Sequence, residues 1–513
     1  MSRRRRSSRR MFEIHQPQGQ VTSRVQAVGP EHFGVLCFDV AKARSKFMLA
    51  DFYGKPLLLP QTVEHTRGEL RTALDLVRQA REHHHLTDLV VAIERTGEYH
   101  RPVQRACRAE GLDTRLVHPL TSQQFRQPAN PGDKTDDHDL AAIFRAAING
   151  FGLVEPVWPD EYQQLQLLVR QRRDLVDKAS VLRNQVREQL HALLPGYAEC
   201  FGDLWEHQLA LPLARVVTSS DALRDRDQVL NLLKQHQLKA RGNVVATIVA
   251  WALQAPAPPA HVALRHAQWL ALDDDRLAKI ALISSIEVQL ARLLCRTPFV
   301  LLMVIPGISV VNAADLAGEV GPLHLYPSAN AITGRAGLMP SRYQSDLVDR
   351  PNGPLRRHGN RRLRRTLLQV ADSLVSCNHH FGVQTLAWRQ RGKDPRWIRV
   401  KVAKAFSRLL FAIVGGKTLF PHPCRQEDHY LTRKLIDFHR QAKTPMAEVM
   451  GDLAALCLQL PRSACATEVA GLNHLQEMPR RGPQPIAELV PFVLARLQAR
   501  MVQSVPSEEA TPG

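Results

Sequence analysis

The sequence predicts an α/β domain with a mixed sheet, followed by a longer and mostly helical region. Near the N-terminus three strand-like apolar runs stand in succession, and helix and strand patterns alternate after them. This order is typical of a mixed sheet with helices on both faces. Beyond about residue 160 the apolar residues recur at helical spacing over long stretches. The chain is therefore expected to hold more than one domain.

In the α/β part, apolar runs predict strands at 33–40, 45–52, 56–60, 86–93 and 113–118. Helical periodicity predicts helices at 64–84 and 98–109, and a third begins after Thr135, a suitable N-cap residue. Residues 1–30 are expected to form a disordered basic arm, because their arginines are not followed by the apolar segment of a signal peptide.

Four acidic residues stand at the ends of these elements. Asp39 ends the first strand, Glu94 follows the fourth, and Asp136 and Asp139 share one face of a helix start. Carboxylates that converge repel each other unless a cation lies between them, and oxygen ligands select Mg²⁺ or Mn²⁺. The alternatives are an acidic first helical turn, a turn residue at position 39 and an ion pair at position 94.

Two long amphipathic helices are predicted at 161–194 and 272–295, with a basic flank on the first. They could pack antiparallel as a coiled-coil-like scaffold or as a dimerising arm. Residues 200–265 between them are irregular in pattern and are expected to form an insertion.

Composition narrows the class of protein. A formal net charge of +19 favours a polyanionic partner, and nucleic acid is preferred because no segment has the pattern of a basic membrane anchor. No apolar run is long enough for a transmembrane helix. The eight cysteines are scattered without paired spacing, which argues against zinc ribbons and disulfide frameworks and favours a reducing compartment.

A second constellation follows residue 297. Residues 304–316 have the pattern of a helix-hairpin-helix-like element, whose Pro306-Gly307 turn would face a phosphate; an ordinary helix-helix turn is the alternative. Further along, an apolar helical stripe at 363–374 leaves Arg361, Arg362, Arg364 and Arg365 off the core face, as a phosphate-tracking helix requires.

Together these motifs resemble the insertion-sequence 110 family, also called DEDD transposases. The resemblance covers about residues 33–150, which resemble the ribonuclease H-like fold of RuvC nucleases, and about 298–415, a C-terminal transposase half. The matching pieces are Phe38-Asp39-Val40, Ile93-Glu94-Arg95-Thr96-Gly97, Lys134-Thr135-Asp136, Asp139-Leu140-Ala141, Pro306-Gly307-Ile308, Ala336-Gly337-Leu338-Met339-Pro340, Ser345, His358-Gly359-Asn360 and Leu363-Arg364.

The resemblance implies that the four acids bind a divalent metal and that Ser345 is the nucleophile that attacks DNA. Asp346 follows this serine where the family usually has glycine. The resemblance also implies a structured non-coding guide RNA and a homo-oligomer whose active sites combine the two domains from different subunits. The residues expected to contact nucleic acid are Lys134, Pro306, Gly307, Arg342, Arg356, Arg357, Arg361, Arg362, Arg364 and Arg365.

The predicted organisation is a basic arm at 1–30, a RuvC-like DEDD domain at 31–155, a helical scaffold with an insertion at 160–297, a mostly α transposase domain at 298–418, and a helical extension at 419–513. The predicted function is a DNA transposase or recombinase with Mg²⁺ or Mn²⁺, cytoplasmic and associated with the nucleoid. A RuvC-like nuclease or junction resolvase that uses metal-activated water is one alternative. A nucleic-acid-binding protein without catalysis is the other.

Overall fold

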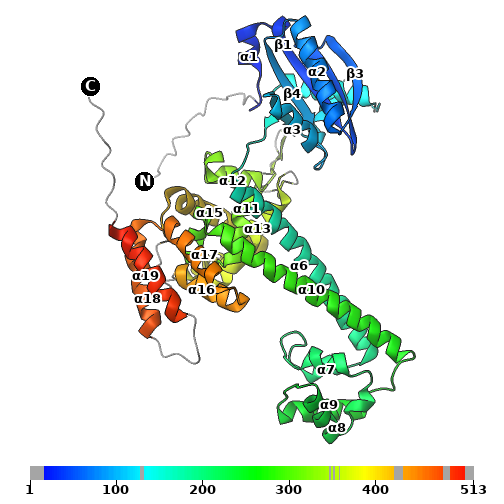
Figure 1. Cartoon of the computed structure of the whole chain (residues 1–513), viewed down its shortest axis with the longest axis vertical. Coiled ribbons are helices and arrows are strands. Elements are labelled where there is room, and N and C mark those ends of the chain that lie inside the picture. The colour runs from blue at the N-terminus through cyan, green and yellow to red at the C-terminus, as the bar shows by residue number, and fades with distance from the viewer. Residues whose placement is uncertain are drawn as a thin grey trace. The chain divides into compact units, whose positions relative to one another are not determined.

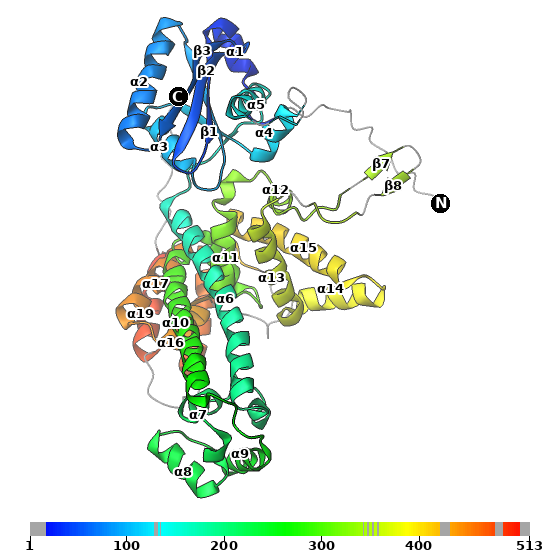
Figure 2. The ribbon, with the colours of Figure 1, turned by 90° about the vertical axis from the view of Figure 1, so that its right-hand side faces the viewer.

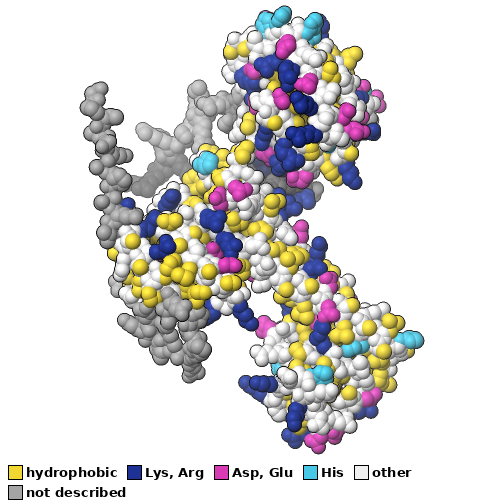
Figure 3. Space-filling view, in the orientation of Figure 1, with side chains coloured by type: hydrophobic (Ala, Val, Ile, Leu, Met, Phe, Trp, Pro, Cys, Tyr) yellow, Lys and Arg dark blue, Asp and Glu magenta, His cyan; other side chains and the backbone are white. Residues whose placement is uncertain are grey.

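The computed structural model describes residues 17–127, 132–133, 135–341, 343–345, 348–350, 353–356, 359–420, 431–477 and 486–502. The chain divides into two compact units, 1–157 and 158–513. Lys and Arg side chains are spread over the visible faces of both units (Figure 3). Within the described ranges, no helix combines the length and the apolar character that crossing a membrane needs.

Unit 1 is built on a six-stranded sheet with the strand order β3-β2-β1-β4-β5-β6. The strands are β1 (Phe33–Val40), β2 (Arg44–Asp51), β3 (Pro56–Glu64), β4 (Asp88–Glu94), β5 (Asp113–Val117) and β6 (Leu153–Val154). β1, β2 and β3 form an antiparallel meander, β1, β4 and β5 run parallel, and β6 pairs antiparallel with β5. The predicted mixed sheet is confirmed, and it is compatible with a ribonuclease H-like domain.

Helices cover both faces of this sheet, because side chains alternate between the faces along β1. Leu36 and Phe38 share a core with α2 (Arg67–His83) and α3 (Arg101–Ala109). Val35 and Cys37 share the opposite core with α5 (Asp136–Ile148). Figure 2 shows α2 and α5 on opposite sides of the strands. Two short helices, α1 (Thr22–Val28) and α4 (Pro119–Arg126), complete the unit.

The first helix corrects one prediction. Residues 1–30 were expected to form a disordered arm, yet Thr22–Val28 is helical and Val25 is buried in the core. The Arg24 guanidinium bonds to Asp88 at 2.7 and 2.5 Å, and it also pairs with Asp113. The fold therefore begins before residue 31, and residues 1–16 lie outside the described part.

In unit 2, α6 (Asp160–Leu193) and α10 (Val262–Leu294) pack along each other (Figure 1). Arg172 Nε donates to Glu287 at 2.6 Å, and Trp269 Nε1 donates to the carbonyl of Val186 at 3.1 Å. The pairing is therefore antiparallel, which is the packing that the sequence allowed for these two helices.

The segment between these helices is more regular than predicted. It forms α7 (Ala210–Val216), α8 (Arg226–Gln235) and α9 (Gly242–Gln254) with two 3-10 turns, η2 (Tyr197–Cys200) and η3 (Ser220–Leu223). These elements enclose their own hydrophobic core with the adjoining ends of α6 and α10. We call this part the tip lobe.

The rest of unit 2 is mostly helical. It contains η4 (Pro298–Val304), α11 (Val310–Val320), η5 (Leu323–Leu325), α12 (Ala329–Arg335), β7 (Tyr343–Ser345), β8 (Val348–Arg350), α13 (Arg361–Cys377), α14 (His379–Gln390), α15 (Pro395–Gly416), α16 (Leu431–Ala442), α17 (Met446–Gln459), α18 (Arg462–Glu477) and α19 (Ile486–Val502). One core runs from Tyr162 to Leu497. The extension expected at 419–513 therefore shares its core with the segment before it.

Candidate catalytic and nucleic-acid sites

Asp39 and Glu94 lie side by side at the C-terminal ends of β1 and β4, the two central strands of the sheet in unit 1. Asp39 stands two residues after Cys37, and Glu94 stands two after Ala92. Cys37 and Ala92 both pack in the core under α5, so alternation turns the two carboxylates toward that same side. The parallel register of β1 and β4, continued by one residue, places Asp39 beside Glu94.

Asp136 and Asp139 come to this side from the first turn of α5. Thr135 caps the helix, since its side chain accepts a hydrogen bond from the backbone N–H of His138 at 3.2 Å. Asp136 and Asp139 then continue the helical stripe of Ile143, which is buried against the sheet. Asp139 is 9% exposed, while Asp136 is exposed.

Lys46 connects the two pairs of acids. It lies opposite Asp39 in the β1–β2 register, and its Nζ is 2.7 Å from Asp137 Oδ1. The pKa of Lys46 is raised, first by the hydrogen bond that its ammonium group donates to Asp137 and then by the charges of Asp137, Asp136 and Asp39. The carboxylates of β1 and α5 therefore act on one ammonium group.

The other two acids have partners on α4. Asp139 pairs with Arg126, and Ser122 Oγ donates to Glu94 Oε1. Ser122 and Arg126 are four residues apart and so share one face of this helix. Thr96 Oγ1 also donates to Glu94, at 3.5 Å. Protein groups thus compensate both acids.

Oxygen donors gathered at one edge fit Mg²⁺ or Mn²⁺, because these cations prefer carboxylate ligands. The described residues contain no group of three His, Cys, Asp or Glu side chains arranged to hold a metal ion. Arg126 and Lys46 instead supply positive charge to these carboxylates. The donor set suits a divalent cation, and coordination by Asp139 would require Arg126 to release this carboxylate.

Ser345 lies in a β-hairpin, for which the sequence analysis predicted no element. It ends β7, and its backbone pairs with Val348 at the start of β8. The base of the hairpin is closed by backbone bonds, with Ser341 N–H donating to the Pro354 carbonyl at 2.8 Å and Arg356 N–H to the Met339 carbonyl at 3.0 Å. The predicted contacts Arg342, Arg357 and Lys134 lie outside the described residues.

The arginines of α13 divide into two kinds. Arg364 donates to the carbonyls of Ala336 at 2.8 Å and Arg356 at 2.6 Å, so it fastens the hairpin base to α13. Arg365 makes a bidentate pair with Asp177 of α6, at 2.9 and 2.7 Å. The side chains of Arg361 and Arg362 are exposed and have no ion-pair partner within the described ranges.

An open pocket of about 370 Å³ lies beside these arginines. Its lining residues are Arg361, Arg364, Arg365, Leu368, Gln369 and Arg399. Four guanidinium groups around one pocket suit an anion, and phosphate matches the guanidinium fork.

Comparisons with known proteins identify relatives of both parts of the chain that carry candidate residues. A sequence model of DEDD transposases of the IS110 type matches residues 36–195, and one of the transposase IS116/IS110/IS902 family matches residues 300–384. A curated Pseudomonas aeruginosa protein described as a probable family 20 transposase is 26% identical over 339 residues. That match covers 65% of this chain and 86% of the relative.

The chain belongs to the IS110 family of transposases. The first match contains the four acids of unit 1, and the second contains Ser345 and the arginines of α13. The transposase thus carries each set of candidate residues inside a segment that resembles the family.

The Pro306-Gly307 turn of the transposase differs from a helix-hairpin-helix element, because η4 before it is a 3-10 helix. Pro306 is buried, and a Cβ added at Gly307, where φ is +90°, would lie 2.9 Å from the Ser373 carbonyl oxygen. Lys434 Nζ donates to three carbonyls around the turn, those of Met303, Ile305 and Ile308, at 2.5, 3.2 and 3.3 Å. Internal packing therefore accounts for both residues of the turn.

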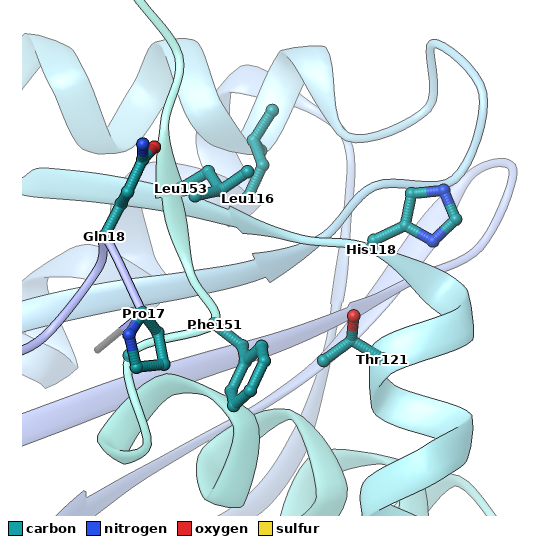
Figure 4. A pocket seen from close by; sticks show the side chains of 8 residues that line it. Pro17, Gln18, Leu116, His118, Thr121, Phe151 and Leu153 are labelled. Atoms are coloured by element: carbon teal, nitrogen blue, oxygen red, sulfur yellow. The ribbon is translucent and has the colours of Figure 1, made fainter. Parts of the chain in front are cut away.

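A second pocket, of about 440 Å³, lies at the β5–β6 edge of unit 1 (Figure 4). Pro17, Gln18, His118 and Phe151 are among its lining residues. None of the four acids lines it, so it is separate from the carboxylate edge.

Sequence reasoning missed the three compensating residues Lys46, Ser122 and Arg126. The first could have been found from the tight β1–β2 turn, which fixes Lys46 opposite Asp39. The other two depend on α4, for which Pro119 at the first helical position was the available signal.

Proposed function

We propose that this transposase cuts and rejoins DNA strands, with Ser345 as the nucleophile and with a divalent cation held by Asp39, Glu94, Asp136 and Asp139. The observation that carries the proposal is the placement of the four acids, from two adjacent strands and one helix start, on the same side of the sheet. Family membership supports the reaction class, which is DNA transposition.

Bound Mg²⁺ or Mn²⁺ would supply a Lewis acid for the phosphoryl oxygens and stabilise charge in the transition state. The four carboxylates would hold it. The Ser345 hydroxyl loses its proton as Oγ attacks phosphorus, and the deoxyribose oxygen that leaves takes up a proton. The product is a phosphoserine link, so the energy of the phosphodiester is kept and strands can rejoin without ATP.

The partners proposed with this function are DNA at the element ends and target, a structured guide RNA, and further copies of the chain. In a homo-oligomer the carboxylates of one subunit would serve Ser345 of another. We place the protein in the cytoplasm, with the nucleoid. The Arg361–Arg365 segment and Arg356 would hold phosphate. Lys134, Arg342 and Arg357, which lie outside the described residues, belong to the same proposal.

A RuvC-like nuclease or junction resolvase is the second candidate. It is favoured by the fact that all four acids lie in unit 1, where they could activate water without Ser345. Binding without catalysis is the third candidate, for which Asp346 after the serine is the motive.

One experiment separates the three. End-labelled DNA is incubated with the full chain and a divalent metal, and the products are resolved on a denaturing gel. We expect a covalent protein–DNA band that disappears in Ser345→Ala and persists in the matched control Ser341→Ala. Cleavage without such a band in the wild type would favour the nuclease, and DNA binding with neither product would favour the binding protein.

A further inference from the structure

A basic surface lies on α14 and α15, beyond the segment matched by either family model. Residues 388–408 contain one acid, Asp394, against the following Lys and Arg residues: Arg389, Arg391, Lys393, Arg396, Arg399, Lys401, Lys404 and Arg408. The Asp394 carboxylate caps α15 by accepting the backbone N–H groups of Arg396 and Trp397. Within the described ranges, only Arg399 of these cations pairs with a carboxylate, that of Asp372. The surface therefore has uncompensated positive charge.

Four of its residues form a single stripe on α15. Trp397, Lys401, Lys404 and Arg408 are separated by four, three and four positions, which places them on one face of the helix. The opposite face, including Val402, is buried. The pKa of Lys404 is lowered by partial burial and then by the charges of Lys401 and Arg408, so the three cations lie close to one another. We call these four residues the α15 stripe.

The tryptophan at the start of the stripe is held in place and remains accessible. Trp397 is 38% exposed, and its ring meets Trp388 of α14 edge-on, with the ring centroids 5.7 Å apart. Trp388 packs against the main core, and α14 lies beside α15 (Figure 2). Lys401 and Lys393 lie 4.9 and 5.8 Å from the centroid of the Trp397 ring. An aromatic ring is thus fixed next to a row of cations.

We propose that the α15 stripe binds an unpaired DNA strand, with a base stacked on Trp397 and successive phosphates on Lys401, Lys404 and Arg408. The cations follow one another at about 4.5 and 6 Å along the helix axis, a spacing that suits neighbouring phosphates of an extended strand. An exposed ring next to cations is the arrangement by which proteins bind single strands without reading sequence. Duplex DNA hides its base faces, so Trp397 favours an unpaired strand over a duplex.

This inference rests on the proposed function, because strand cutting and exchange release an unpaired strand. Binding of that strand by α15 would keep it near the transposase until rejoining. The lysines that lie over the Trp397 ring would turn toward phosphate as a base takes their place.

The test is fluorescence anisotropy of a dye-labelled 15-nucleotide DNA strand of mixed sequence, titrated with the full chain at several salt concentrations. Trp397→Ala should weaken binding about 5- to 150-fold, the range measured for loss of one base stack, without changing the salt slope. Trp397→Phe should recover most of the loss. Lys401→Gln/Arg408→Gln should flatten the plot of log affinity against log salt by about 1.4, since each contact with a single strand contributes roughly 0.7.

Lys234→Gln/Lys239→Gln is the matched control, because it removes two exposed charges from the tip lobe. It should leave the slope unchanged, and circular dichroism checks that every variant is folded. Wild-type affinity in the stripe variants, or an equal loss for a 15-base-pair duplex, would overturn the proposal. A larger loss for a single RNA strand of the same sequence would assign the stripe to RNA and would also overturn it.

The gel for the covalent adduct distinguishes failure of the α15 stripe proposal from failure of the proposed function. An adduct in the wild type together with unaltered stripe variants refutes the α15 stripe alone. Loss of single-strand affinity in those variants without any adduct in the wild type supports the stripe and refutes the nucleophile.

Discussion

The proposal of a metal site depends most on two residues, Asp136 and Asp139. We expect Asp136→Asn and Asp139→Asn to abolish strand cleavage while DNA binding stays nearly intact or becomes slightly tighter. Loss of one carboxylate weakens a bound cation and also reduces repulsion of phosphate. The measurement is metal-dependent cleavage of labelled DNA, with affinity determined in parallel.

Asp137→Asn is the matched control for this pair. Asp137 is a neighbour in the same helical turn, but it is exposed and pairs with Lys46. It should keep most of the cleavage activity. Because Asp139→Asn also leaves Arg126 without its charge partner, thermal unfolding must show that the variant is folded. Normal cleavage by a folded Asp136→Asn or Asp139→Asn protein would remove these residues from the metal site.

The arginines of α13 are expected to differ from one another. Arg361→Ala/Arg362→Ala should flatten the salt dependence of duplex binding by about 1.8, since each phosphate contact in B-DNA contributes roughly 0.9. Affinity should fall alike for specific and scrambled sequences, because phosphate contacts carry no sequence information. Arg364→Ala should instead lower thermal stability, because Arg364 holds two carbonyls at the hairpin base. A wild-type salt slope in the double variant would show that the DNA lies on another face.

Among the elements, those with strong local patterns were predicted well. β1 was predicted with its observed bounds, because its apolar run is continuous up to Asp39, one residue before the strand ends. α6 was predicted to within one residue at each end, since its apolar stripe persists over many turns. The strand predicted at 56–60 does begin at Pro56, but β3 continues to Glu64. The helix predicted from residue 64 therefore begins only at Arg67.

The elements that were missed depend on tertiary contacts. α4 is short and polar, and only Ser122 of its residues is buried. The β7–β8 hairpin lacks an apolar alternation that could have predicted it, and its base is fixed by Arg364 from another element. α9 is apolar on most of its sides, so its pattern does not indicate a single buried face. The four acids were found because they end predictable elements, whereas their partners Lys46 and Arg126 required the packed structure.

The contact between α16 and α17 predicts a pH effect. His439 Nε2 lies 3.4 Å from Asp452 Oδ2 in the core, with Arg292 and Glu448 nearby. Burial raises the pKa of Asp452 to about 6 and lowers that of His439 to about 4. Between about pH 4 and 6 the folded state binds the extra proton at Asp452, which makes stability fall as pH rises. Over the same range the unfolded state binds more protons at His439, which makes stability rise.

These opposite effects nearly cancel in the wild type. Asp452→Asn removes the loss of stability that the ionisation of Asp452 causes as pH rises. The variant should therefore gain stability relative to the wild type as pH increases from 4 to 6. At pH 7 the gain should reach at most about 3 kcal/mol, because the pKa of Asp452 is raised by about two units and each unit corresponds to about 1.4 kcal/mol. Thermal unfolding of both proteins across this range provides the measurement. A difference between them that does not change with pH would contradict the assigned ionisation.

At the scale of the whole molecule, the reaction that we propose divides between the two units. Unit 1 holds the four acids, and unit 2 holds Ser345, the arginine pocket and the α15 stripe. The first family match, residues 36–195, contains the four acids of unit 1 and continues into α6 of unit 2, whereas the second, residues 300–384, lies within unit 2. Under the mechanism that we propose, both units would have to act on the same DNA strand, within one chain or between chains.

The most direct test of this claim is to locate the covalent bond to DNA. The protein–DNA adduct is digested with nuclease and protease, and the modified peptide is sequenced by mass spectrometry. We predict a nucleotide on Ser345, formed only with divalent metal and absent from Asp139→Asn. The same segment contains the hydroxyl residues Ser341 and Tyr343. A nucleotide on either of these, or cleaved DNA with every peptide unmodified, would contradict the account.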